Sequence, residues 1–267
     1  MLNAEFLIRD RLNKISADWG IDTGFTVSPD SVKHLGIICD GNRRAAQEWG
    51  VPAFLGHRVG VEVIKGISRA SRDWGIKALT FWVWSTENWN RDNEQVAFVM
   101  QLAEEFLPQK ELLDELTENR VRFTHLGRKD RLPPTLTRTL QKLEESTRDF
   151  DNYYLNLALD YGGLNEMARG VRRIFDQFIM GKFDPNILDR REEVIYEFLD
   201  TSGQPLPDLV IRTGVRKREI PHTSGFMPLQ TAYSGWIFLP DLFPNLTPER
   251  LIASIRDFEG YKRRFGQ

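Results

Sequence analysis

The residues best suited to chemistry follow directly on an apolar stretch near residue 40. The stretch 34–39 is succeeded by an acid, a glycine, an amide and two arginines, namely Asp40, Gly41, Asn42, Arg43 and Arg44. Arginine donates paired, charge-assisted hydrogen bonds to phosphate, and glycine lets a ligand come close to the backbone. A carboxylate among arginines suits a Mg²⁺ ion that bridges it to phosphate oxygens. The alternative is an ordinary turn between a strand and a helix at a solvated edge.

Two further polar segments could meet the first one at the same edge of a sheet. Ser85–Arg91 follows the apolar stretch 77–83, and Arg212 ends the stretch 208–212. Because ligands bind beyond the carboxyl ends of parallel strands, these segments would lie together. The arginines that could converge on an anion are Arg43, Arg44, Arg91, Arg212, Arg216 and Arg218. Loop arginines are commonly just solvated, so the residues alone leave open a phosphate-binding α/β enzyme and a polar sheet rim.

The apolar pattern that must position these residues alternates short strands with longer helices. Strands are predicted at 34–39, 77–83, 121–126, 153–159, 208–212 and 235–239. A helix is predicted at 3–18, a capping box at Asp92 and Gln95, and a helix start at Thr247 and Pro248. This alternation predicts an α/β domain with a central, mainly parallel, six-stranded sheet flanked by helices. Residues 1–30 are predicted to form an N-terminal helical extension of that domain.

Length and composition limit the class of protein. The 267-residue chain has 41% hydrophobic and 28% charged residues and a net charge of −2, so bulk charge does not suggest nucleic-acid binding. The single cysteine, Cys39, cannot form an internal disulfide, which fits a cytoplasmic protein. No apolar run reaches the length of a membrane span. The sequence lacks zinc-ligand spacing, a P-loop, a GxGxxG motif and a GxSxG motif.

Two of the four histidines lead to different expectations. His125 alternates with Phe123 inside a predicted strand, so a structural role is expected for it. His57 lies in Gly56-His57-Arg58 at a predicted helix start, where it could contact phosphate.

At this point the motifs resemble those of the cis-prenyltransferases, the undecaprenyl diphosphate synthase family. The matching strings are HLGIICDGNRRAAQEWG (34–50), GHRVGVEVIKG (56–66), LTFWVWSTENWNR (79–91), LDYGG (159–163), DLVIRTG (208–214), HTSGFMPLQTAYS (222–234) and RRFG (263–266). They occur in family order and cover nearly everything after residue 30. The resemblance therefore implies that residues 31–267 form a cis-prenyltransferase-like catalytic domain, with a hydrophobic tunnel for the prenyl chain.

The resemblance also implies a reaction and a set of roles. The family condenses isopentenyl diphosphate with an allylic prenyl diphosphate, forms a Z double bond and releases diphosphate. Carried over by motif, the catalytic residues are Asp40, Asn42, Arg44, Ser85 and Asn88, with Asp40 also positioning Mg²⁺. The substrate-binding residues are Gly41, Arg43, His57, Trp89, Arg91, Arg212, Arg218, His222 and Ser224. In the homodimers of this family, the C-terminal segment, here Arg264 and Gly266, reaches the isopentenyl site of the partner.

Several positions depart from the family pattern. Ala45 and Ala53 replace a tryptophan and a phosphate-contacting arginine, and Gly235 replaces the second Mg²⁺-associated glutamate. Because glycine has no side chain to coordinate the metal, the resemblance leaves three options: Asp40 with phosphate oxygens and water, Glu219 or Asp241, or a carboxylate of a partner chain. The segment before Ser224 is also longer than usual, which puts His222 where an arginine is expected and lets Arg218 substitute for it.

Product length and alternative functions are also predicted from the resemblance. The apolar stripe of the tunnel-lining helix is Val96, Val99, Met100, Ala103, Phe106 and Leu107. Val83 stands where the family often has a smaller residue, which predicts a short- to medium-chain product. One alternative is a member that makes branched or cyclised terpenoids, and another is a non-catalytic subunit of a heteromeric enzyme. Retention of the polar constellation argues against the subunit. Any membrane association would be peripheral and would depend on the lipid product.

Overall fold

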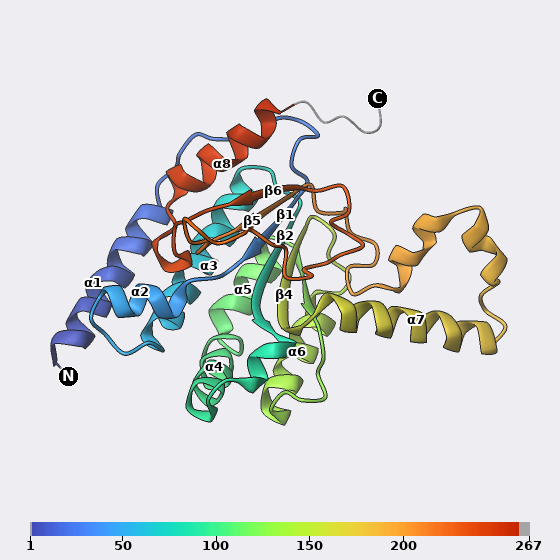
Figure 1. Cartoon of the computed structure of the whole chain (residues 1–267), viewed down its shortest axis with the longest axis horizontal. Coiled ribbons are helices and arrows are strands. Elements are labelled where there is room, and N and C mark those ends of the chain that lie inside the picture. The colour runs from blue at the N-terminus through green and yellow to red at the C-terminus, as the bar shows by residue number, and fades with distance from the viewer. Residues whose placement is uncertain (1, 262–267) are drawn as a thin grey trace.

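The computed structural model describes residues 2–261 and contains one parallel six-stranded sheet (Figure 1). The strand order is β3-β4-β2-β1-β5-β6, and each neighbouring pair runs parallel. The strands are β1 His34–Ile38, β2 Ala78–Ser85, β3 Val121–Leu126, β4 Tyr153–Tyr161, β5 Leu209–Arg212 and β6 Gly235–Phe238. The predicted six-stranded α/β architecture is therefore confirmed.

Helices precede and connect the strands. They are α1 Leu2–Trp19, α2 Asn42–Glu48, α3 Leu55–Asp73, α4 Asn93–Phe106, α5 Lys110–Glu118, α6 Pro134–Thr147, α7 Gly163–Ile179 and α8 Pro248–Gly260. Short 3-10 helices form η1 Thr86–Asn90, η2 Pro185–Asp189, η3 Glu192–Phe198 and η4 Phe243–Asn245. Within the described part of the chain, none of the helices combines the length and apolar content that a bilayer crossing needs.

The predicted helix caps explain where two of these helices begin. Asp92 accepts a hydrogen bond from the backbone N–H of Gln95 at 2.8 Å, and Thr247 accepts one from the backbone N–H of Arg250 at 3.3 Å. The second half of the capping box was predicted wrongly. The side-chain oxygen of Gln95 accepts instead from Nη1 of Arg43 at 3.2 Å, which ties α4 to α2.

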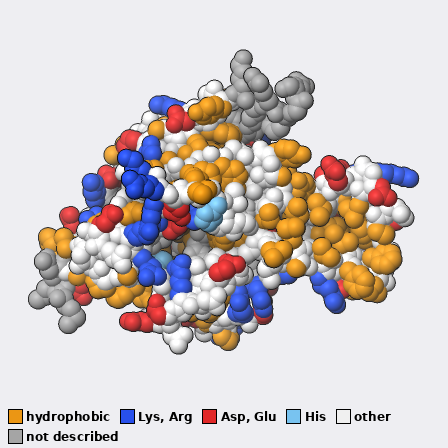
Figure 2. All heavy atoms as spheres, in the orientation of Figure 1, with side chains coloured by type: hydrophobic (Ala, Val, Ile, Leu, Met, Phe, Trp, Pro, Cys, Tyr) orange, Lys and Arg blue, Asp and Glu red, His pale blue; other side chains and the backbone are white. Residues whose placement is uncertain are grey.

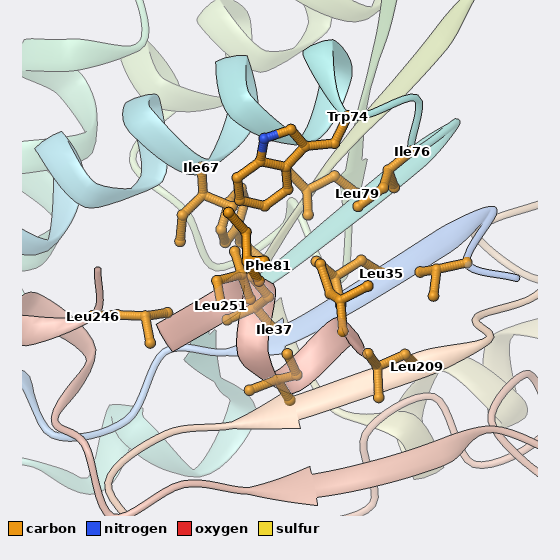
Figure 3. Packing of buried hydrophobic residues seen from close by; sticks show 14 of the residues in the cluster. Leu35, Ile37, Ile67, Trp74, Ile76, Leu79, Phe81, Leu209, Leu246 and Leu251 are labelled. Atoms are coloured by element: carbon orange, nitrogen blue, oxygen red, sulfur yellow. The ribbon is translucent and has the colours of Figure 1, made fainter. Parts of the chain in front are cut away.

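The largest apolar cluster lies between the sheet and the helices α3 and α8 (Figure 3). Leu35 and Ile37 of β1 and Phe81 of β2 pack there against Ile67 of α3 and Leu251 of α8. All five side chains are fully buried, so β1 and β2 are fixed in position up to the residues where their polar extensions begin. The core therefore holds the carboxyl edge of the sheet rigid.

Strand β2 continues two residues further than predicted because it still pairs with β4 as far as Ser85, although this pairing is irregular. Trp82 pairs with Ala158 and Trp84 pairs with Leu159, so Val83 is an extra residue in the ladder. Regular alternation would put Trp82 and Trp84 on the same face. Instead Trp82 packs with Tyr161 in one cluster, whereas Trp84 packs in another cluster with residues of α4 and α6. The bulge thus turns the end of β2 as it enters the Ser85–Arg91 segment.

Candidate active site

A cavity of about 800 Å³ opens at the carboxyl edge of the sheet, and we call it the polar cavity. Figure 2 shows Lys and Arg side chains gathered around a hollow near the centre of one face. Segments that follow β1, β2 and β5 supply its wall, as predicted for a parallel sheet. Eleven predicted site residues line it: Asp40, Gly41, Asn42, Arg43, Arg44, His57, Ser85, Asn88, Arg91, Arg212 and Ser224.

Three predicted site residues lie off this wall, and two lie outside the described residues. Trp89 packs edge-on against Trp84, with ring centroids 6.3 Å apart. Arg218 is exposed to solvent, and Arg216 lines the cavity in its place. His222 contacts the site indirectly, through Arg212. Arg264 and Gly266 are outside the range 2–261.

Asp40 lies between two arginines at the centre of the site. Nη2 of Arg44 donates to Oδ1 at 3.3 Å, and Nη2 of Arg212 donates to Oδ2 at 3.2 Å. Among the described residues that line the polar cavity there are five arginines and two carboxylates, Asp40 and Glu87. This excess of positive charge makes the cavity an anion site, in which Asp40 offers a carboxylate beside the bound anion.

The start of α2 is shaped by a backbone that glycine permits. Gly41 has φ of 106°, in the region that favours glycine, and an added Cβ would lie 2.8 Å from a side-chain carbon of Leu242. Next to it, Nδ2 of Asn42 donates to the backbone oxygen of Cys39 at 2.9 Å. Oδ1 of Asn42 is buried and has no hydrogen-bond partner within residues 2–261. This oxygen can accept a hydrogen bond from water or from a protonated phosphate oxygen.

His57 reaches the same wall from the first turn of α3. Burial, aided by the charges of Arg91 and Arg43, lowers the pKa of His57 to about 4, so its ring is neutral at neutral pH. Its Nε2 atom is buried and lacks a partner among the residues described. The ring can thus offer a hydrogen bond to a ligand without adding positive charge.

Contacts between arginine guanidinium groups and tryptophan rings support the Ser85–Arg91 segment. The guanidinium of Arg91 lies over the Trp84 ring at 5.4 Å, and that of Arg131 lies over the Trp89 ring at 5.5 Å. Arg131 also forms a two-pronged ion pair with Asp160, which is fully buried and has φ of 54°. This clamp fixes Arg91 at the cavity, although Arg131 and Asp160 do not line it.

Two smaller, apolar cavities continue inward from the polar cavity. The inner cavity, of about 130 Å³, shares Cys39, Asn42, His57 and Val83 with the polar cavity. The far cavity, of about 170 Å³, shares Val61, Ile64, Phe106, Leu107 and Leu157 with the inner one. Four members of the predicted apolar stripe line the inner cavity, namely Val99, Ala103, Phe106 and Leu107. The other two, Val96 and Met100, pack in the cluster that contains Trp84.

Gly235 lies at the amino ends of the strands, whereas Asp40 lies beyond their carboxyl ends. Gly235 is the first residue of β6 and pairs with Leu209, which in turn pairs with Leu35 of β1. Asp40 is five residues beyond Leu35, or about 16 Å along an extended chain. An added Cβ on Gly235 would also lie 2.4 Å from the Phe258 ring. A side chain at position 235 could not join Asp40 of the same chain in holding a metal.

The two acidic residues considered as substitutes are also absent from the wall of the polar cavity. Glu219 is exposed and accepts a hydrogen bond from the backbone of Arg216, and Asp241 pairs with Arg250 at 3.0 Å. Across residues 2–261, no group of three or more His, Cys, Asp or Glu side chains is arranged to hold a metal ion. Asp40 nevertheless fits Mg²⁺, which commonly takes one or two carboxylates plus substrate phosphates.

Some residues that shape the site carried little signal in the sequence. Arg216 belonged to the set of candidate arginines, but the family pattern favoured Arg218 because the inserted stretch shifts the count. Asp160 of β4 and Arg131, in the turn between β3 and α6, are 29 residues apart. No local motif connects them, so their pairing is visible only in the fold.

Comparisons with known proteins agree with this geometry. The family model described as "Putative undecaprenyl diphosphate synthase" matches residues 38–266. The isoprenyl transferase of Aquifex aeolicus (strain VF5) is 38% identical over 235 residues, covering 88% of this chain and 96% of that protein. The tritrans,polycis-undecaprenyl-diphosphate synthase (geranylgeranyl-diphosphate specific) of Thermococcus kodakarensis is 39% identical over 237 residues, covering 88% and 87%.

A solved structure extends the similarity to three dimensions. Lavandulyl diphosphate synthase from Lavandula x intermedia, in complex with dimethylallyl diphosphate, superposes with a TM-score of 0.80 at 29% identity. The match covers 89% of this chain and 99% of that one. A family match over most of the chain and an arginine-lined cavity at the carboxyl edge of the sheet lead to one conclusion: this chain belongs to the undecaprenyl diphosphate synthase family and is a cis-prenyltransferase.

Proposed function

We propose that the protein condenses isopentenyl diphosphate with an allylic prenyl diphosphate to give a Z-prenyl diphosphate of short to medium chain length. The observation that carries this proposal is the adjacency of the polar cavity, lined by five arginines, to two apolar cavities. Such a site suits a ligand with a highly charged head and a hydrocarbon tail. The names of the relatives, isoprenyl transferase and undecaprenyl diphosphate synthase, support the same class of substrate.

Departure of diphosphate begins the reaction. The allylic carbon–oxygen bond breaks, and its electron pair leaves with the diphosphate. Arg43 and Arg44, with the backbone at Gly41, hold this leaving group, and their charge stabilises it more as negative charge accumulates. His57, whose ring is neutral at neutral pH, donates a hydrogen bond to the same group, because the diphosphate oxygens are acceptors.

Carbon–carbon bond formation follows in the same cavity. The double-bond electrons of isopentenyl diphosphate attack the allylic carbon, while Arg212 and Ser224 hold its diphosphate. The attack leaves positive charge on the tertiary carbon of the isopentenyl unit. A proton then leaves the carbon between this tertiary carbon and the CH₂ that bears the diphosphate, and the C–H electron pair forms the Z double bond. The proton passes to an oxygen of the released diphosphate. Ser85 and Asn88, which line the cavity at the end of β2, are suited to relay it.

Asp40 would hold Mg²⁺ together with diphosphate oxygens and water. A bound Mg²⁺ would neutralise charge on the departing diphosphate. The Asp40 side chain is 42% exposed to the cavity, so it is accessible to such a complex. Arg44 and Arg212 orient the carboxylate through their hydrogen bonds.

The prenyl tail would extend from the polar cavity through the inner cavity into the far cavity. Val83 lies at the boundary of the first two, since it lines both. Its β-branched side chain narrows the path at this point. This position supports a limit on product length.

Replacing Val83 with alanine tests that limit. We expect Val83→Ala to lengthen the main product by at least one isoprene unit, because it widens the passage into the inner cavity. Product length is read by mass spectrometry after extraction. The matched control is Ile21→Ala, an exposed apolar residue after α1 that lines none of the three cavities, which should leave the distribution unchanged. Unchanged products from Val83→Ala would show that this residue does not limit the chain.

Assembly and location are proposed on more general grounds. Helix α7 extends away from the body and carries exposed apolar side chains on its outer part (Figures 1 and 2). These are Val171, Phe175, Phe178 and Ile179. Exposed apolar patches of this kind mark association surfaces, and we propose that α7 serves a homodimer. The protein would act in the cytoplasm and touch membranes only through its product.

One assay decides between the proposed function and its alternatives. The purified protein is incubated with labelled isopentenyl diphosphate, Mg²⁺ and dimethylallyl, geranyl or farnesyl diphosphate, and the products are identified. Linear Z-prenyl diphosphates support the proposal. Branched or cyclised products would replace it with the second candidate, which the similarity to lavandulyl diphosphate synthase favours. Turnover that appears only after a second chain is added would indicate a non-catalytic subunit.

A further inference from the structure

The outer wall of the far cavity contains a cluster of charged side chains that joins two helices. Glu115 of α5 accepts from Arg69 of α3, with distances of 3.1 Å from Nε to each carboxylate oxygen and 2.8 Å from Nη2 to Oε2. Arg72, one turn further along α3, donates from Nη2 to Oε1 of Glu115 at 3.3 Å. We call these three residues the end latch. All three line the far cavity.

The same three side chains also face solvent. Their side-chain exposures are 55% for Arg69, 26% for Glu115 and 17% for Arg72. Because each of them lines the cavity and is also partly exposed, the end latch lies where the cavity approaches the protein surface. Most of the deeper wall is apolar and includes Leu79, Leu116, Phe123 and Leu155. A hydrocarbon chain that fills this cavity therefore meets apolar atoms first and charged groups last.

We propose that the end latch closes the far end of the tail path and sets the longest product that the enzyme makes. The inference rests on the proposed function, in which the prenyl tail grows inward from the polar cavity. A tail that reaches the ion pairs can grow further only by displacing them, since hydrocarbon cannot replace the hydrogen bonds and water that these charged groups require. Val83 governs how readily the tail enters the inner cavity, and so the main product. Arg69, Arg72 and Glu115 determine the length at which a tail that has passed Val83 must stop.

A second ion pair on α3 provides an internal comparison. Arg58 joins α3 to Glu105 of α4 with bonds of 2.6 and 3.3 Å. Its side chains are 38% and 42% exposed, yet neither residue lines any of the three cavities. Removing this pair should perturb packing between helices as much as opening the end latch does, without changing the tail path.

The test compares Glu115→Ala with Glu105→Ala in the full chain. Both are assayed in detergent with saturating isopentenyl diphosphate and a short allylic primer. We expect Glu115→Ala to extend the longest product by at least one isoprene unit, and Glu105→Ala to match the wild type. Glu115→Gln, which keeps the size and part of the hydrogen bonding, should give an intermediate distribution. Identical distributions from Glu115→Ala and the wild type would overturn the inference.

A binding series separates this inference from the proposed reaction. Non-hydrolysable prenyl diphosphate analogues of increasing length are titrated into each variant by calorimetry. For the wild type, affinity should stop rising at a limiting chain length. For Glu115→Ala, the first analogue beyond that limit should bind about tenfold more tightly. Lack of turnover in the wild type would contradict the proposed function alone, whereas an unmoved limit in this series would contradict the end latch.

Discussion

Arg212 connects the two halves of the polar cavity through several of its N–H groups. Nη1 donates to Oγ of Ser224 at 2.6 Å and to the backbone oxygen of His222 at 2.8 Å, while Nη2 donates to Asp40. The side chain is 9% exposed, so its planar guanidinium is held in one orientation. A single group thus ties the proposed isopentenyl side of the site to the proposed metal carboxylate.

Replacing Arg212 with lysine should keep the positive charge and lose the planar arrangement of N–H donors. The acceptors are divided between two guanidinium nitrogens, and the single nitrogen of lysine cannot reach all of them, so we expect kcat/KM for isopentenyl diphosphate to fall about 100-fold. Steady-state kinetics with varied isopentenyl diphosphate measures this. Arg256→Lys is the matched control, because Arg256 is exposed and far from the cavity, stacked over Phe25. A loss of twofold or less at Arg212 would mean that charge alone suffices.

Among the secondary-structure elements, the carboxyl ends of β2 and β4 support the site, and the pairing between these two ends is irregular. Val83 is the extra residue in β2, and Asp160 is the extra residue in β4, between Leu159 and Tyr161. Asp160 adopts a positive φ, which allows its carboxylate to turn inward and pair with Arg131. The irregular ends therefore serve as the support of the Ser85–Arg91 segment.

We expect Asp160→Asn to loosen that segment. Asparagine tolerates the positive φ, but it cannot form the ion pair that fixes Arg131. The free energy of unfolding should fall by about 1–3 kcal/mol, and kcat by about tenfold with little change in KM for isopentenyl diphosphate. Denaturant unfolding and kinetics check both values. The control is Asp130→Asn, which removes an exposed ion pair with Arg128 and should change neither.

The sequence predicted the elements better than it predicted the contacts between them. The six strands were readable because each is a short apolar run, and the loops after β1, β2 and β5 followed from parallel topology. The bulge at Val83 was not readable, since periodicity alone puts Trp82 and Trp84 on one face. The end latch was hidden for a different reason: Arg69 and Glu115 look like ordinary solvent-facing charges, and their position over a cavity depends on how α3 and α5 pack.

At the scale of the whole molecule, buried histidines tie stability to pH. Burial is the main cause that lowers the pKa of His34, His57 and His125 to about 4, compared with 6.5 for an unperturbed histidine. In the unfolded chain they take up protons near pH 6.5, so between these values unfolding binds protons. The contribution of these three histidines to the free energy of unfolding is fully present above pH 6.5 and is lost as the pH falls toward 4. Burial and the charge of Asp200 raise the pKa of Glu166, which offsets at most one proton.

The free energy of unfolding should therefore decrease by roughly 2–3 kcal/mol per pH unit near pH 5. Denaturant titrations between pH 7 and pH 4.5, followed by tryptophan fluorescence, measure this slope. His125→Asn should reduce the slope by about 1 kcal/mol per pH unit, because it removes one of the three histidines. His222→Asn is the control, since His222 is exposed. A slope of zero would mean that the native protein accommodates protonated histidines.

Because β1 is a central strand of the sheet, the site can form only late in the synthesis of the chain. Asp40 and Arg212 are 172 residues apart in the chain, and β1 gains its second neighbour only when β5 is available. At ribosomal rates of 5–20 residues per second, roughly 10–35 s of synthesis separate these two residues. During that interval the five buried residues of β1 have at least one unpaired edge. The nascent chain is thus most prone to aggregate just before it becomes able to bind a diphosphate.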